Sequence, residues 1–147
     1  MADSKALALK VWIVLARTHN AVSQRAADDV ARHGLTLAEF AVLEALYHKG
    51  SLLLGEVQKK ILVSSGGVTY LVDRLEQRGY VRRKLCEEDR RARYAELTTE
   101  GRERMDRIFP EHADMITETI SALSAQEQRD LIRMMKELGF HAAGEPA

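Results

Sequence analysis

The sequence predicts a mainly α-helical protein with one β-hairpin. Apolar residues recur at spacings of three and four through most of the chain, as they do on one face of an amphipathic helix. The runs "TLAE" and "SAQE" have the capping-box pattern, in which a Thr or Ser side chain and a later Glu satisfy each other's backbone amides at a helix start. "YVRRKLC" and "RYAELT" are strand-like, and the polar "EEDRRA" between them predicts a hairpin with a charged tip.

Length and composition limit the class of protein. The chain has 147 residues, enough for a single domain with its own core. Its one cysteine, Cys86, cannot form an internal disulfide, which is typical of a reducing compartment. The sequence shows neither a signal-peptide pattern nor a long apolar span, so we expect a cytoplasmic protein.

Three helices are expected before the chain midpoint. Residues 4–32 lack Pro and Gly and predict one long amphipathic helix. Thr36 then caps a helix over residues 37–47, with Glu39 as its capping-box partner. A short helix is expected over about residues 53–60. The buried set predicted for the second helix is Phe40, Ala41, Leu43 and Leu46.

A further helix is expected over about residues 65–78, followed by the hairpin over about residues 80–97. Its apolar residues define one buried stripe and leave the other residues facing outward. Gly79 is placed to end this helix in a left-handed conformation. The stripe consists of Val68, Leu71, Val72 and Leu75.

Two helices are expected after the hairpin. The first begins at "TTEG", and Pro110 is expected to kink or interrupt it. The second begins at Ser124 and is expected to run to about Leu138, before Gly139, with a frayed tail after it.

The net charge is zero, but the charges are unevenly distributed. Between residues 78 and 93 there are seven basic and three acidic residues, whereas from residue 94 to the end there are six basic and eleven acidic residues. This asymmetry favours one basic face that meets a polyanion.

Three short helices followed directly by a charged hairpin predict a winged helix-turn-helix, in which one helix enters the DNA major groove and the hairpin lies beside it. The small residues at the start of the expected recognition helix would let backbone amides approach a phosphate; they are Ser64, Ser65, Gly66 and Gly67. Thr69, Tyr70 and Arg74 are the expected contacts to base edges or phosphates.

The stretches "LTLAEFAVLEALYHKGSL", "SSGGVTYLVDRLEQRGYVRR" and "EEDRRARYAELTTEG" resemble the MarR (multiple antibiotic resistance regulator) family of bacterial transcription regulators. The resemblance implies a homodimer that represses transcription by binding a palindromic operator. It implies a DNA-binding lobe at residues 35–98 within a single domain of residues 1–147. Dimerisation helices would lie at residues 1–34 and 99–140 of that domain. In the wing it implies that Arg91 enters the minor groove, that Arg90 contacts phosphate and that Asp89 orients the loop.

Several other features have competing interpretations. The five histidines are dispersed, which argues against a metal site, and "SSGG" lacks the lysine and spacing of a nucleotide-binding loop, so neither an enzyme nor a cofactor is expected. Trp12 is either a core residue or, with Arg17 and His19, a wall of a pocket for a small aromatic or phenolic effector.

Two rival functions remain open. Cys86 follows a basic stretch that favours the thiolate, so the alternative to a ligand-released repressor is a redox-sensing one. A non-specific architectural DNA-binding protein would share the same basic wing, and only a measured specificity ratio separates it from a repressor.

Overall fold

The computed structural model describes residues 2–61, 65–89 and 92–146. The chain divides into two compact units, Met1–His112 and Ala113–Ala147, and each is described by itself. The described elements are α1 (Ala2–Ala31), α2 (Leu37–Lys49), β1 (Leu52–Leu53), α3 (Leu54–Ile61), α4 (Ser65–Gln77), β2 (Val81–Leu85), β3 (Arg93–Leu97), α5 (Thr99–Ile120) and α6 (Ala125–Ala143). The mainly α-helical prediction is confirmed, and α5 passes from the first unit into the second.

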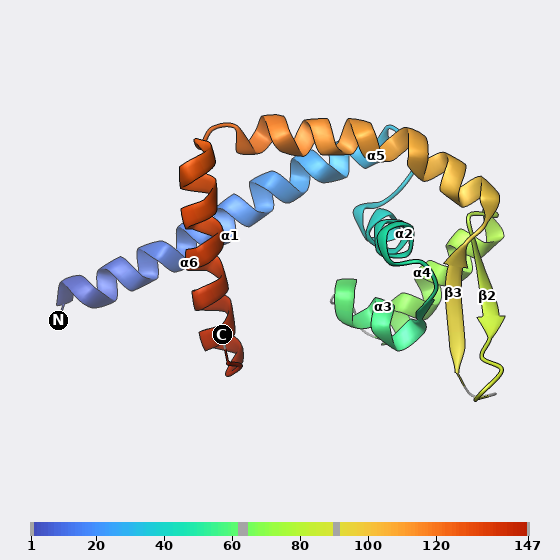
Figure 1. Ribbon diagram of the computed structural model, residues 1–147. Coiled ribbons are helices and arrows are strands. Elements are labelled where there is room, and N and C mark those ends of the chain that lie inside the picture. The colour runs from blue at the N-terminus through green and yellow to red at the C-terminus, as the bar shows by residue number, and fades with distance from the viewer. Residues whose placement is uncertain (1, 62–64, 90–91, 147) are drawn as a thin grey trace. The chain divides into compact units, whose positions relative to one another are not determined.

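A small antiparallel sheet lies at one end of the first unit (Figure 1). β3 is its middle strand, with Leu52 of β1 opposite Ala95 on one side and Arg83 of β2 opposite Ala95 on the other. The predicted hairpin is therefore confirmed, but β1 was not predicted. A strand of two residues has no periodicity of its own, and β1 is defined only by its pairing with β3.

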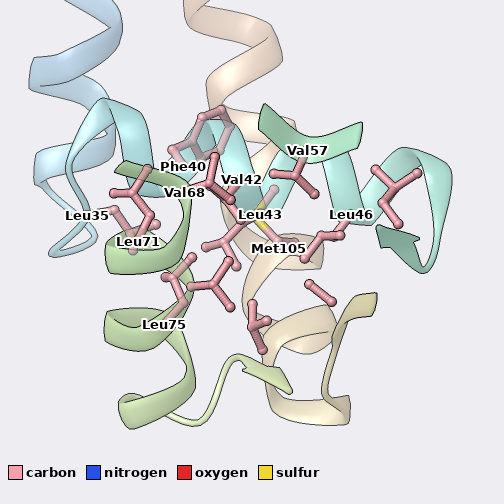
Figure 2. Close-up of a cluster of buried hydrophobic side chains, with 14 of the residues drawn as sticks. Leu35, Phe40, Val42, Leu43, Leu46, Val57, Val68, Leu71, Leu75 and Met105 are labelled. Atoms are coloured by element: carbon pink, nitrogen blue, oxygen red, sulfur yellow. The ribbon is translucent and has the colours of Figure 1, made fainter. Parts of the chain in front are cut away.

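The core of the first unit lies among α2, α3, α4 and the start of α5 (Figure 2). The predicted stripe of α4 is confirmed, because all four of its apolar side chains are buried. On α2 the prediction needs one correction: Val42 is fully buried, whereas Ala41 is only half-buried. Val42 and Leu46 are four residues apart, so they share a helix face that points into the core.

The helix ends agree with the sequence in part. Both capping boxes form, Thr36 with Glu39 and Ser124 with Glu127. Of the two outcomes expected at Pro110, a kink or an interruption, the interruption does not occur, because α5 continues through this residue. A proline ring removes only one intrahelical hydrogen bond, and the turns on both sides keep theirs.

α6 also continues past the predicted end. It includes Gly139 and ends at Ala143, so the first three residues of the tail 141–147, which was expected to fray, are helical. The left-handed residue that ends it is Gly144, whose N–H donates to the carbonyl oxygens of Phe140 and His141. Gly139 lies within the helix, and it was mistaken for the C-terminal cap.

The first half of α1 and much of α6 expose apolar side chains. Residues 2–21 of α1 are all exposed, and none of the α6 residues is buried. The large exposed apolar residues on these helices are Leu7, Leu9, Val11, Trp12, Ile13, Val14, Leu15, Ile132, Met134, Met135, Leu138 and Phe140. The predicted long helix is confirmed as α1, but its exposed apolar residues at positions 11–15 are consecutive, so they lie around the helix rather than along one face. Among the described residues, no helix is long and apolar enough to cross a membrane.

We define the wing as β2, β3 and the tip between them. The hydrogen bonds of Thr98, together called the joint, fix the base of the wing. Thr98 N–H donates to the carbonyl oxygen of Tyr80 at 3.1 Å, and Thr98 Oγ1 donates to that of Gly79 at 2.6 Å. The same hydroxyl accepts from Gly101 N–H at 3.0 Å, which caps the start of α5. A Cβ at Gly101 would overlap the carbonyl oxygen of Tyr80, so only glycine fits there. The end of β3 is thereby fixed to the turn between α4 and β2.

We predict that Gly101→Ala destabilises the protein by about 2 to 3 kcal/mol, because its methyl group forces the start of α5 away from Tyr80. Gly55→Ala is the matched control, since a Cβ at that helical glycine meets nothing within 4 Å. Urea unfolding of both variants measures the difference. Equal stabilities would show that the joint adjusts without cost.

Candidate nucleic-acid interface

The outward face of α4 is polar and accessible. Thr69, Tyr70, Asp73 and Arg74 are exposed, whereas the opposite stripe is buried in the core. α4 begins at Ser65, so the expected helix start is confirmed, and its backbone includes Gly66 and Gly67. Ser64 lies outside the described residues. The polar residues of α4 therefore lie on one side of the helix, and the apolar residues on the other side pack against the core, as expected for an amphipathic helix.

Arg74 on this face contacts two residues, Tyr70 and Glu39. Its Nη1 donates to the Tyr70 hydroxyl at 3.3 Å, and its guanidinium carbon lies 5.8 Å from the Tyr70 ring centroid. Its Nε lies 3.6 Å from Oε2 of Glu39, a carboxylate on α2 that is only 2% exposed. About half of the Arg74 side chain remains exposed. The arginine is therefore oriented before any ligand binds.

Arg83 fastens the wing to α4. Its Nη2 lies 2.7 Å from Asp73 Oδ1 and its Nη1 lies 3.1 Å from Glu76 Oε1. Its backbone N–H also donates to Glu76 Oε2 at 3.0 Å. Two carboxylates of α4 therefore bind one residue of β2, which fixes the direction in which the wing leaves the helix.

A second set of contacts ties the three strands together. Glu96 on β3 accepts from Ser51 Oγ at 2.7 Å and from Arg82 Nε at 2.6 Å. These hydrogen bonds lower the pKa of Glu96 below its ordinary value, and the bond from Ser51 contributes most, followed by the bond from Arg82. The carboxylate is mostly buried, so it is a structural part of the wing.

Comparison with known proteins decides the family. The sequence model of the MarR family matches residues 33–92. The chain is also 42% identical over 134 residues to the HTH-type transcriptional regulator MhqR of Bacillus subtilis (strain 168), an alignment that covers 91% of this chain and 92% of that protein. The chain belongs to the MarR family. The members of this family are transcription regulators that bind DNA through a winged helix, and they are not enzymes.

Solved structures of MarR regulators share the fold. A MarR family transcriptional regulator from Streptomyces coelicolor, in complex with DNA, has a TM-score of 0.86 and 25% identity, covering 92% of this chain and 88% of that one. BpsR of Bordetella bronchiseptica, studied for regulation of its DNA binding by 6-hydroxynicotinic acid, has a TM-score of 0.79 and 24% identity, covering 88% and 98%. The predicted winged helix-turn-helix fold is confirmed.

The basic segment of residues 78–93, which the sequence analysis predicted to meet a polyanion, also forms ion pairs within the chain. Of its seven basic residues, Arg78, Arg82 and Arg83 all form ion pairs within the chain. The predicted basic face stays a prediction, although these three arginines are paired within the chain. These arginines anchor the wing and α4, since each has a carboxylate within 4 Å.

The wing tip carries the predicted minor-groove and phosphate contacts. Arg90 and Arg91 lie outside the described residues. The carbonyl oxygen of Asp89 accepts from Ala92 N–H at 3.0 Å, which closes the tip through its backbone. This contact involves only the backbone of Asp89, so the predicted orienting role of its side chain stays a prediction.

The other predicted site residues are dispersed. Cys86 is half-buried at the end of β2, with its Sγ 3.9 Å from the Tyr94 hydroxyl. Trp12, Arg17 and His19 all lie on the exposed half of α1, and His19 Nε2 is 3.5 Å from Ser23 Oγ. In the described residues, no group of three His, Cys, Asp or Glu side chains could hold a metal ion.

Sequence reasoning missed the importance of Glu39, Arg83 and Glu96. For Glu39 a signal was present, because it lies four residues before Leu43 and seven before Leu46, on the apolar face of α2. A charged residue in that position is buried and requires a partner. For Arg83 and Glu96 no such signal existed.

We predict that Glu96→Gln makes stability less dependent on pH. A glutamate with a lowered pKa stabilises the fold fully above its unfolded-state pKa of about 4.3, and this contribution is lost as the pH falls through the lower folded-state pKa. Urea midpoints between about pH 6 and pH 3 should therefore fall less steeply in the variant.

Glu103→Gln, which removes an exposed carboxylate of α5, is the control and should follow the wild-type curve. Parallel curves for the wild type and Glu96→Gln would contradict the role assigned to Glu96.

Proposed function

We propose that this MarR family protein is a homodimeric repressor that binds a palindromic operator in the cytoplasm and is released by a small aromatic or phenolic ligand. The observation that carries the sequence-specific part is the exposed polar face of α4, with a wing fastened beside it by Arg83. A rigid pairing of helix and hairpin suits simultaneous contact with a major groove and its neighbouring backbone.

Dimerisation is supported by the apolar side chains exposed on α1 and α6. Trp12 is 66% exposed and Leu7 is 65% exposed, and Ile132 and Met135 on α6 are also open to solvent. Exposed apolar side chains that gather on a helix often mark an interface, and each of these two helices carries such a group. A second copy of the chain supplies the same surface in return, and two-fold symmetry then predicts two half-sites about one helical turn apart.

The roles at the DNA follow from chemistry and position. The amides of residues 64–67 are assigned to a phosphate near the start of α4. Thr69, Tyr70 and Arg74 are assigned to base edges or phosphates in the major groove. Arg91 is assigned to the minor groove and Arg90 to a phosphate, with Asp89 orienting the tip. A guanidinium on a thin hairpin suits a narrow minor groove with its enhanced negative potential.

The operator is obtained by selecting duplexes from a random pool with the wild-type protein. We predict that Arg91→Ala weakens binding to the selected duplex by about tenfold without changing the unfolding midpoint, and lowers the slope of log affinity against log salt by about 1.

Arg107→Ala removes the same charge from an exposed position on α5 and should bind normally. An unchanged affinity for Arg91→Ala would refute the minor-groove role. A ratio near one between selected and random duplex in the wild type would identify a non-specific DNA-binding protein instead.

Two exposed side chains of α1 support the proposed ligand class: Trp12 offers an aromatic face, and Arg17, five residues further on, offers a cation for a carboxylate. BpsR provides a precedent within the fold, since 6-hydroxynicotinic acid regulates its DNA binding. A ligand acts by binding one spacing of the two DNA-binding lobes more tightly than another.

We predict that a phenolic acid that releases the operator also changes the fluorescence of Trp12, the one tryptophan of the chain. 4-Hydroxybenzoate is a suitable first probe, and Arg17→Ala should raise the concentration needed for release by about tenfold. Release without any change in Trp12 emission would place the ligand elsewhere.

Cys86→Ser is the control for this release assay and also tests the redox alternative. The half-buried thiol lies where β2 meets the wing tip, so its oxidation would add a polar group within the wing. Release by the phenolic acid should be the same in this variant. Release by peroxide in the wild type that disappears in Cys86→Ser would favour the redox alternative.

A further inference from the structure

We propose that Glu39 is a positioning residue that sets base discrimination by holding Arg74 in one orientation on α4, and that it does so at the expense of non-specific DNA affinity. The proposal rests on the proposed function of α4 as the helix that contacts bases.

The carboxylate of Glu39 has two oxygens with different surroundings. Oε1 accepts from the backbone N–H of Thr36 at 3.0 Å and completes the capping box of α2. Oε2 is buried and accepts no hydrogen bond within the described residues, but it lies 3.6 Å from both Arg74 Nε and Arg78 Nη1. One oxygen thus serves the helix cap, and the other faces two guanidinium groups of α4.

The helix cap does not explain the charge. Glutamine completes a capping box as well as glutamate does, because the cap needs only a hydrogen-bond acceptor. The chain contains a second box, Ser124 with Glu127, in which the glutamate is exposed. Burying a carboxylate costs free energy unless cations compensate it. Burial raises the pKa of Glu39, but the hydrogen bonds from Thr36 and the charges of Arg74 and Arg78 outweigh this and lower it, so the group is ionised at neutral pH.

The two arginines have different surroundings. Arg78 Nη1 donates to the carbonyl oxygen of Gly34 at 2.8 Å, which uses this guanidinium to anchor the turn after α1. Arg74 lies between Glu39 beneath it and the Tyr70 hydroxyl beside it, with about half of its side chain exposed. An arginine that is already oriented loses less conformational freedom when it binds a base edge. Glu39 therefore favours a directed contact by Arg74.

The same charge also weakens attraction to phosphate. Sequence-independent affinity comes from cations that neutralise phosphates, and a carboxylate 3.6 Å from two arginines opposes that effect. With a neutral side chain at position 39, Arg74 would lose its ion-pair partner and could adopt other rotamers. It could then bind a backbone phosphate in DNA of any sequence. Specificity should fall as non-specific affinity rises.

We expect Glu39→Gln to bind random duplex about threefold more tightly and to lose about tenfold in the ratio of selected-duplex to random-duplex affinity. Glu127→Gln is the matched control and should change neither quantity, since it alters the other capping box. The wild-type ratio is measured first, and a value near one there would refute the proposed function rather than this inference.

A purely structural role for Glu39 predicts a different result. Partial unfolding of Glu39→Gln would weaken binding to both duplexes together and leave their ratio unchanged, and that outcome would overturn the proposal. The unfolding midpoint sets the temperature at which both proteins are compared in the folded state.

A double-mutant cycle with Arg74→Met tests the path of the effect. In that background Glu39→Gln should no longer change the ratio, because the side chain that it positions is gone. A tenfold loss that persists without Arg74 would show that Glu39 acts through another residue and would also overturn the proposal.

Discussion

The close approach of α5 to the backbone of Tyr80 is the constraint on which the DNA-binding lobe depends. Gly101 permits this approach, and Thr98 uses its backbone amide and its hydroxyl to fasten the end of β3 to the turn before β2. Because α5 also contributes Met105 and Ile108 to the core, the wing is tied to the same packed unit as α4. Thr98 and Gly101, which lie in the run "LTTEG" at the end of the wing, thus have a structural role.

The dense opposite charges around the wing follow from the same constraint. Once β2 and α4 are held side by side, Arg83 lies within reach of Asp73 and Glu76, and Arg82 lies within reach of Glu96. Partly exposed ion pairs of this kind add little stability individually, but together they restrict the angle between wing and helix. Three of the seven basic residues at positions 78–93, namely Arg78, Arg82 and Arg83, therefore have a structural role within the chain.

The features that the sequence predicted correctly are local ones. The stripe of α4 follows from its own spacing, and both capping boxes involve residues three positions apart. The features that it missed depend on distant partners: β1 exists only because β3 pairs with it, and Glu39 meets Arg74 across two helices. Gly139 was misjudged because a helical glycine and a C-terminal cap look alike in sequence. The outward face of α4 was predictable, whereas the orientation of Arg74 on it was not.

A chain with no net charge has little long-range attraction to DNA, so its local field must guide binding. Ionic screening restricts that field to about 8 Å at physiological salt, which is comparable to the reach of one side chain. The signs of the charges next to α4 and the wing then affect DNA binding more than the net charge of the chain does. The buried carboxylate of Glu39 lies within that range of both Arg74 and Arg78. We therefore expect selectivity to depend on Glu39, the buried carboxylate beside Arg74 of α4, as well as on the residues proposed to contact DNA.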